Sequence, residues 1–580
     1  MYARIVRFRR VIHAGSFQQF MIAIVAACAM TLGTVSVAGA SHGSLYDLTT
    51  RAHRSDHGNG HGNGDGNGNG NGNGNGNGDG DGRNKTPAIV TTSGPLKGIV
   101  KGNVTEFLGI PFAAPPVGHL RWMPPQPYGY FHGLLDASSF GSVCTQGGRG
   151  TENCLFLNIY VPNFKKNDDK HGGAMPVMFW IHGGGLTSGA GSDYDPTPLL
   201  RTGNVIVVTI NYRLGYLGFF AQTALDSEGH DAGNYGLMDQ QFAMQWVQNN
   251  IAAFGGDPGN VTIFGESAGG HSVYCNLASP TAAGLFAHAI SESGSYLMFD
   301  TFIQSIVPLS VGETTSGLVP SGNSVASGFG CSTAACLRAV SNTALVGVQP
   351  GTLYAFVDGT LLTETPAQAF ASGNFNRVPV IAGTNHDEWA LFVAEQYDAT
   401  GNPILTEAEY DAATSGPNGL YGPALGPLVE LVYPYAPPGG QVLTASGTDG
   451  IFACSARNGD ALLSNFTNTY TYEFNDELAP PQPQPFSFPL GAFHSAELQF
   501  LFDVGYFFEL TPSELQLSNA MVGYWTNFAA TGNPNGGSLP TWSLYNPTSD
   551  IFQSLVPPTP TTESTFNTEH LCDGFWNLIP

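Results

Sequence analysis

The segment "FGESAGGHS" at residues 264 to 272 holds a serine in a pattern that could carry nucleophilic catalysis. Ser267 is the middle residue of Gly265-Glu266-Ser267-Ala268-Gly269, which matches the G-x-S-x-G pattern of a nucleophile elbow. In an elbow the serine sits on a tight strand-to-helix turn with glycines on both sides, because side chains there would collide with neighbouring backbone. The alternative interpretation is a small residue in a crowded corner. The apolar run "VTI" before the motif favours the elbow.

A serine hydroxyl needs a base to take its proton, and the base needs an acid to orient it and to stabilise its charged form. In folds with an elbow the chain order is serine, acid, histidine. The segment "IAGTNHDEWALF" offers Asp387 and Glu388, and "LGAFHSAELQFLF" offers His494 in a loop. His386 is the main competitor for the base. Its closeness to Glu388 in the sequence favours a solvated loop position for it.

A run of three glycines in "WIHGGGLTSG" could bind negative charge. The unhindered backbone N–H groups of Gly183, Gly184 and Gly185 could converge with the N–H of Ala268 on a developing oxyanion. A tight turn after a buried strand is the other interpretation. The neighbouring elbow motif favours the oxyanion hole, and we expect His182 to have a structural role.

The elements that must position these residues alternate between strand-like and helix-like segments from about residue 87 onward. Short apolar runs bounded by Gly, Pro or Asn predict strands buried on both faces at residues 176–181, 204–212, 260–265 and 377–383. Apolar residues at four-residue spacing predict an amphipathic helix over 236–254, closed by Gly255. This order predicts an α/β fold with a large, mostly parallel, doubly wound sheet, whose sites lie at strand C-termini.

The N-terminal region is expected to lie outside this fold. Residues 1–40 read as a secretory signal, because four arginines precede an uncharged run that ends at Ala38-Gly39-Ala40, although a retained membrane anchor is the alternative. Residues 41–86 alternate Gly with Asn or Asp and predict a disordered tether. His57 and His61 could ligate a metal there, but the regular apolar position of calcium-binding glycine-rich repeats is missing. We expect no metal site and no cofactor.

Cysteines, sequons and charge are consistent with export. Of the eight cysteines, Cys28 leaves with the signal, and the odd remainder allows at most three bridges and one free thiol. The bridges that we expect, two over short loops and one tying down the C-terminal region, are Cys144–Cys154, Cys331–Cys336 and Cys454–Cys572, with Cys275 as a buried thiol. Glycosylation sequons occur at Asn84, Asn103, Asn260 and Asn465, and Asn260 should be modified least readily, because it directly precedes a strand. The net charge of −24 argues against a nucleic-acid partner.

The block "GNYGLMDQQFAMQWVQNNIAAFGGDPGNVTIFGESAGGHSV" resembles the type-B carboxylesterases, the cholinesterase-like branch of the α/β-hydrolases. Further matches include "FLGIPFAAPPVGHLRW", "TENCLFLNIYVP", "VPVIAGTNHDEWALF", "GAFHSAELQFLF" and "CDGFWN", so the resemblance covers residues 87–580 as a single domain. The bridges expected above also match the family's pattern.

This resemblance implies an acyl-enzyme on Ser267, with His494 as base and then acid and Glu388 as the third member. Asp387 stays a rival to Glu388, although the family motif places the acid at the second carboxylate. The remaining positions implied by the resemblance are the oxyanion donors Gly184, Gly185 and Ala268, and a polar network behind the histidine that includes Glu266 and Ser293.

The first cysteine loop departs from part of the family. Only nine residues, "TQGGRGTEN", separate Cys144 from Cys154, and none is aromatic. In cholinesterases and the related fungal lipases this loop is long and carries a choline-binding aromatic residue or a mobile lid. The short loop therefore favours an esterase with an open gorge, and together with the signal at residues 1–40 it predicts a secreted esterase that acts on uncharged, apolar carboxylic esters. The alternatives are a triacylglycerol or sterol ester lipase and a non-catalytic binding protein on the same fold, because some relatives have lost the serine.

Overall fold

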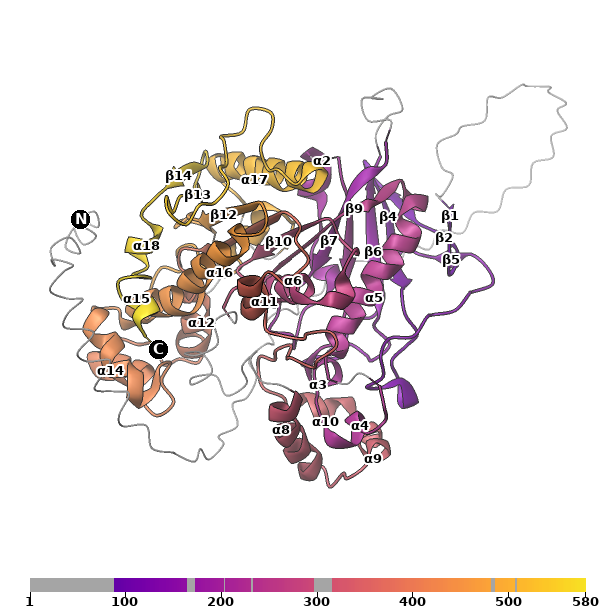
Figure 1. Cartoon of the computed structure of the whole chain (residues 1–580), viewed down its shortest axis with the longest axis horizontal. Coiled ribbons are helices and arrows are strands. Elements are labelled where there is room, and N and C mark those ends of the chain that lie inside the picture. The colour runs from indigo at the N-terminus through magenta and orange to yellow at the C-terminus, as the bar shows by residue number, and fades with distance from the viewer. Residues whose placement is uncertain are drawn as a thin grey trace, which may run out of the picture.

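The computed structural model describes residues 88–163, 173–202, 204–230, 233–296, 315–480, 486–505 and 509–579. The predicted signal at 1–40 and the predicted tether at 41–86, with His57, His61 and the sequon at Asn84, lie outside these ranges. The described chain is built around one large sheet that helices cover on both faces (Figure 1).

The central sheet has 11 strands in the order β14-β13-β12-β11-β10-β9-β7-β8-β6-β4-β3. In chain order the strands are β3 (Ile99–Lys101), β4 (Val104–Pro111), β6 (Phe156–Pro162), β7 (Met175–Ile181), β8 (Ile206–Ile210), β9 (Gly256–Glu266), β10 (His288–Glu292), β11 (Val380–Asn385), β12 (Thr469–Phe474), β13 (Phe552–Leu555) and β14 (Thr561–Glu563). Neighbours from β8 through β7, β9, β10, β11 and β12 to β13 pair in parallel, and the edges pair antiparallel. The predicted mostly parallel α/β sheet is confirmed.

Alternating side chains of the central strands enter two separate cores. On β7, Val177 and Phe179 join the core on one face, while Met178 and Trp180 join the core on the other face. Because both faces are buried, each strand reads as a continuous apolar run instead of an alternating one. The expected strand boundaries were less accurate than the strands themselves. Strand β9 begins at Gly256, through an irregular register with β7, and β11 ends two residues later than predicted, at Asn385.

The predicted helix after β8 is α5 (Tyr235–Asn250), which continues as a short 3₁₀ turn and ends at Gly255 with φ 89°. It packs on one face of the sheet with α6 (Ala268–Ala278), while α17 (Pro512–Thr531) packs on the other face. The amphipathic description of α5 was incomplete, because several of its polar residues are buried as well, although Gln245 and Asn249 are exposed. For example, Asp239 pairs with Arg213, and Gln240 donates a hydrogen bond to Ser272 Oγ (3.0 Å).

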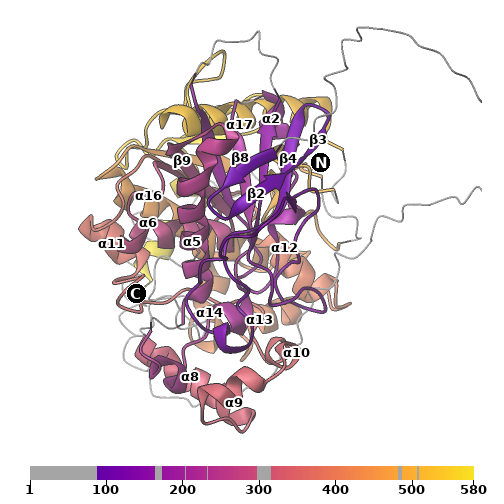
Figure 2. The same ribbon diagram turned by 90° about the vertical axis from the view of Figure 1, so that its right-hand side faces the viewer.

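A group of small helices lies apart from the sheet at the bottom of Figure 2. It consists of α8 (Thr315–Gly328), α9 (Ala334–Ala339) and α10 (Asn342–Val346). Among the helices in the described ranges, none is both long enough and apolar enough to cross a membrane.

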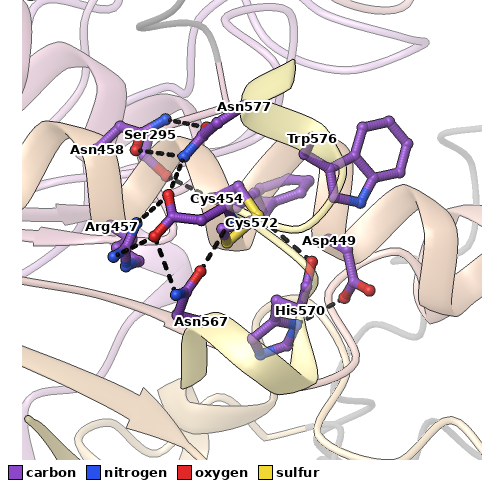
Figure 3. Close-up of a disulfide and its surroundings, with 12 residues drawn as sticks. Ser295, Asp449, Cys454, Arg457, Asn458, Asn567, His570, Cys572, Trp576 and Asn577 are labelled. Carbon is purple, nitrogen blue, oxygen red and sulfur yellow. Dashed lines mark hydrogen bonds and ion pairs between the residues drawn. A yellow bond between two sulfur atoms is a disulfide. The ribbon is translucent and has the colours of Figure 1, made fainter. Parts of the chain in front are cut away.

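Three disulfide bonds join the cysteine pairs that the sequence suggested: Cys144–Cys154, Cys331–Cys336 and Cys454–Cys572. Cys275 is a buried free thiol. The Cys454–Cys572 bond fastens the C-terminal segment to α16 (Cys454–Ser464), as Figure 3 shows. Arg457 on the same helix pairs with Asp573 at 3.0 Å. The C-terminal segment is therefore held to the fold by covalent and ionic contacts at one place.

Removing the Cys454–Cys572 bond should destabilise the protein more than removing Cys331–Cys336. The two bonds span sequence separations of 118 and 5 residues. In the chain-entropy model the longer loop corresponds to roughly 5 kcal/mol of stabilisation and the shorter loop to roughly 2 kcal/mol. Thermal unfolding of the Cys454→Ser/Cys572→Ser and Cys331→Ser/Cys336→Ser variants measures the difference. An equal or smaller loss in the first variant would contradict this expectation.

Candidate active site

Ser267 sits on the sharp turn between β9 and α6. Its backbone has φ 56° and ψ −123°, a conformation that non-glycine residues rarely adopt. The flanking glycines leave no room for a side chain, because a Cβ would lie 2.5 Å from Ile181 O at Gly265 and 2.0 Å from it at Gly269. The turn is further fixed by a hydrogen bond from Ser267 N–H to Glu292 O (2.9 Å). Close packing against β7 thus forces the serine into the strained conformation that lifts its hydroxyl from the sheet.

The structure brings together the serine, acid and histidine that the sequence suggested. With its proton on Nδ1, His494 donates to Glu388 Oε2 at 2.5 Å, and its Nε2 accepts from the hydroxyl of Ser267 at 2.8 Å. Glu388 is fully buried, and its other oxygen accepts hydrogen bonds from Thr384 Oγ1 and from the N–H of Asn385, both at 2.8 Å. The carboxylate is therefore fixed on both oxygens, and it can orient the imidazole and stabilise its protonated form.

The two rivals of these residues have other partners. The carboxylate of Asp387 accepts a hydrogen bond from Ala492 N–H (3.0 Å) instead of contacting His494. His386 lies in the turn after β11, as expected for a loop residue, but its side chain is only 31% exposed, so it is partly buried. Its Nδ1 lies 3.2 Å from Asp387 Oδ2, and its ring lies 5.6 Å from the ring of His570. Burial lowers the pKa of His386, but Asp387 and the nearby Glu473 outweigh burial and raise the pKa to about 10.

A second carboxylate faces the imidazole from the elbow itself. Glu266 Oε1 lies 3.2 Å from His494 Nε2. Burial alone would lower the pKa of His494, but Glu266 and Glu388 outweigh burial and raise the pKa to about 9. For Glu266, burial raises the pKa to about 7, although the nearby His494 acts in the opposite direction. The site therefore stabilises an imidazolium ion, the form that the histidine takes once it has accepted a serine proton.

The glycine loop after β7 lies directly against the serine. A Cβ at Gly183 would lie 3.1 Å from Ser267 Cβ, and Gly184 and Gly185 have φ of 101° and 61°. Within the described ranges, no acceptor takes the N–H of Gly184, Gly185 or Ala268. Backbone donors without acceptors next to a nucleophile are what an oxyanion hole requires.

His182 shapes this loop instead of taking part in proton transfer. Its ring stacks on Tyr212 with centroids 4.4 Å apart, and Nδ1–H donates to Gly183 O at 2.8 Å. Complete burial lowers its pKa to about 4, so the ring is neutral. The structural role expected for His182 agrees with these contacts.

The polar surroundings of the histidine differ in part from expectation. Glu266 contacts the imidazole, but the hydroxyl of Ser293 is buried without a hydrogen-bond partner in the described part of the chain. Sequence reasoning missed Asn385 and Glu497, although a charged residue inside the apolar "AELQFLF" was a signal for the latter. Asn385 Nδ2 donates to Glu497 and to Phe493 O (2.8 Å), which connects the end of β11 to the histidine loop.

Two phenyl rings flank the imidazole. The ring centroids of Phe392 and Phe452 lie 5.0 Å and 5.2 Å from that of His494. Phe392 ends the segment "IAGTNHDEWALF" that carries the acid, whereas Phe452 comes from a segment that the sequence did not connect with the serine. They give the apolar surroundings that restrict the histidine and reduce the access of water to it.

Taken together, these residues can carry acyl transfer. A strained serine lies at hydrogen-bond distance from a base, and the base is held by a buried acid. Beside the serine lie N–H donors that no acceptor in the described part of the chain takes. No group of three or more His, Cys, Asp or Glu residues within the described ranges could hold a metal ion.

Comparisons with known proteins agree with this chemistry. The model of the "Carboxylesterase family" matches residues 85–421 and 439–572. A cocaine esterase from Oryctolagus cuniculus is 35% identical over 491 residues, which cover 76% of this chain and 86% of the relative. A para-nitrobenzyl esterase from Bacillus subtilis is 34% identical over 487 residues, which cover 80% and 93%. The solved structure of a thermophilic PNB esterase superposes with a TM-score of 0.69 at 31% identity and covers 84% of this chain and 100% of that one.

Replacing Glu266 by Gln should move the pH dependence of serine labelling to lower pH. His494 must be neutral to accept the proton of Ser267, and the Glu266 carboxylate favours the imidazolium form. Without that carboxylate the pKa of His494 falls, by about one unit or more for the loss of a close opposite charge. The rate of labelling of Ser267 by a fluorophosphonate is measured from pH 5 to 10. The midpoint is the pH at which this rate reaches half of its maximum.

Glu292→Gln is the matched control, because this buried carboxyl on the adjacent strand β10 bonds to Trp525 Nε1 (2.7 Å) and not to the imidazole. Its midpoint should equal that of the unmodified protein. A Glu266→Gln midpoint that stays in place or moves upward would show that Glu266 does not set the pKa of His494.

Proposed function

From its membership of the carboxylesterase family and from the site geometry, we propose that the protein hydrolyses uncharged, apolar carboxylic esters through an acyl-enzyme on Ser267. The chain belongs to this family and is an ester hydrolase of it. The observation that carries the proposal is the continuous hydrogen-bonded series from Glu388 through His494 to Ser267. A hydroxyl that only filled a crowded corner would not need a base aligned on it by a buried acid.

In the acylation step, His494 Nε2 takes the proton of Ser267 while Oγ bonds to the carbonyl carbon of the ester. The carbonyl oxygen becomes an oxyanion that accepts hydrogen bonds from the N–H groups of Gly184, Gly185 and Ala268. When the C–O bond to the alcohol breaks, His494 returns the proton to the leaving alkoxide. An ester of Ser267 and free alcohol result.

Deacylation repeats this sequence with water. His494 takes one proton from the water, the hydroxide oxygen bonds to the acyl carbon, and the same three N–H groups hold the oxyanion. The bond to Ser267 Oγ then breaks, and His494 gives the proton back to the serine. Glu388 keeps its charge throughout and stabilises the imidazolium in both steps.

The preference for apolar, uncharged esters is supported by the surroundings of the histidine and by the short first disulfide loop. Phe392 and Phe452 present rings to His494, and the nine residues between Cys144 and Cys154 contain no aromatic side chain that could bind a cationic alcohol. The name of one relative, a para-nitrobenzyl esterase, refers to an ester of an uncharged aromatic alcohol.

Ser267→Ala should abolish the hydrolysis of p-nitrophenyl esters. Loss of the nucleophile is expected to lower kcat by about 10⁵-fold or more, as in other serine hydrolases. The assay compares acyl chains from acetate to palmitate and includes emulsified triglyceride and a sterol ester. Ser464→Ala is the control, because its hydroxyl on α16 donates to Ala461 O (3.0 Å) of the same helix, and it should keep full activity.

Three outcomes would change the proposal. Equal turnover by Ser267→Ala and the unmodified protein would remove the serine from the mechanism. A preference for emulsified triglyceride or sterol ester over short soluble esters would favour the lipase alternative. Absence of turnover on every ester would favour a binding role.

We also propose that the protein is secreted. The arginine-rich, then apolar, N-terminus and the three disulfide bonds support passage through an oxidising compartment. Two sequon asparagines, Asn103 and Asn465, are exposed, whereas Asn260 is partly buried at the edge of the fold and donates to Ala530 O (3.2 Å).

A secreted form should carry glycans on Asn103 and Asn465. Removal of N-glycans by an endoglycosidase should lower the mass of protein collected from the medium of a eukaryotic host. Asn103→Gln and Asn465→Gln should each lower the mass of the glycosylated protein by that of one glycan. Asn260→Gln should leave the mass of the glycosylated protein nearly unchanged. Unglycosylated protein retained inside the cells would argue against secretion.

A further inference from the structure

The acid and the base of the site lie on two loops that are far apart in the sequence and adjacent in space. Glu388 follows β11, and His494 precedes the 3₁₀ helix η9 (Ala496–Phe500), 106 residues later. The loops are bonded backbone to backbone, from His494 N–H to Glu388 O (3.3 Å) and from Asp387 N–H to Ala492 O (3.0 Å). The distance between acid and base therefore depends on how firmly the loops are joined.

Asp387 joins the two loops through its side chain as well. Its Oδ2 accepts the hydrogen bond of Ala492 N–H at 3.0 Å. Asp387 thus contributes both a donor, its backbone N–H, and an acceptor, its carboxylate, to the opposite loop. The histidine loop passes closely over the carboxylate. A Cβ at Gly491, whose φ is 62°, would lie 2.2 Å from Asp387 Oδ2.

The same carboxylate oxygen also lies beside the ring of His386. Asp387 Oδ2 lies 3.2 Å from His386 Nδ1, and the side chains of Asp387 and His386 are only 28% and 31% exposed. The ring of His386 in turn lies 5.6 Å from that of His570 in the C-terminal segment. His570 is fixed between Asp449 and Glu473 at 2.6 Å each, and Figure 3 shows it beside the Cys454–Cys572 bond.

From these contacts we propose that Asp387 is a positioning residue, whose carboxylate holds the histidine loop in the place where His494 reaches both Glu388 and Ser267. The proposal rests on the ester hydrolase mechanism given above. Asp387 touches neither the imidazole nor the serine, so its effect passes through the backbone of residues 491–494. In enzymes a displacement of about 1 Å at such a distance from the reacting atoms can cost about 100-fold in rate.

The test compares three variants on p-nitrophenyl acetate. Asp387→Ala removes the acceptor of Ala492 N–H, and we expect kcat to fall about 10- to 100-fold while KM changes less than about 2-fold. Asp387→Asn keeps a side-chain oxygen at the same position and should restore most of the lost kcat.

Asp398→Ala is the matched control. Its carboxylate also accepts a backbone N–H from a distant loop, at Ser487, together with the Ser487 hydroxyl (2.9 Å). This pair does not contact the residues of the proposed triad, so Asp398→Ala should keep the kcat of the unmodified protein.

Fluorophosphonate titration separates positioning from folding. All rates are expressed per serine that the reagent labels at completion, which removes any unfolded fraction from the comparison. Asp387→Ala should label the same serine but more slowly than the unmodified protein. An unchanged kcat per labelled serine in Asp387→Ala, or an equal loss in Asp398→Ala, would overturn the positioning role. Activity in Ser267→Ala would instead overturn the mechanism on which it rests.

Discussion

The packing of the turn at Ser267 against β7 is the constraint on which the site depends. Carbonyl oxygen Ile181 O lies so close to Gly265 and Gly269 that a Cβ at either position would overlap with it. The turn closes through Ser267 with φ 56°, and the same close approach brings the glycine loop after β7 against the serine. One steric requirement therefore positions the nucleophile and the proposed oxyanion donors together.

Charge at the site is arranged around one imidazole. Glu388 and Glu266 approach different nitrogens of His494, and together they raise its pKa against the effect of burial. Two further buried carboxyls, Glu292 and Glu497, stand close by, and burial raises the pKa of both. Neighbouring acids that keep their protons add little negative charge, which limits the repulsion among the carboxyls in this dry region.

The C-terminal part of the chain supplies the acid and the base of the site and the contacts that support their loops. Loops after β11 and before η9 carry the acid and the base, and Asp387 and Asn385 connect them by hydrogen bonds. The C-terminal segment reaches the same region through His570 and is fastened there by the Cys454–Cys572 bond. The contacts that hold the C-terminal segment therefore lie next to the contacts that hold the acid loop of the site.

Some of this arrangement could be predicted from the sequence because it is local. Steric and apolar patterns within short segments indicate the motif around Ser267, the glycine run after a strand and the order of strands and helices. Within such a segment, residues are close in space because they are close in the sequence. Resemblance to a family supplied the choice of Glu388 over Asp387. The tertiary structure alone decided that Asp387 bonds to Ala492, that His386 faces His570, and that Asn385, Glu497 and two phenyl rings surround His494. Those contacts join segments that are far apart in the sequence, and no local pattern encodes which distant side chains a loop will meet once the sheet has brought the strand ends together.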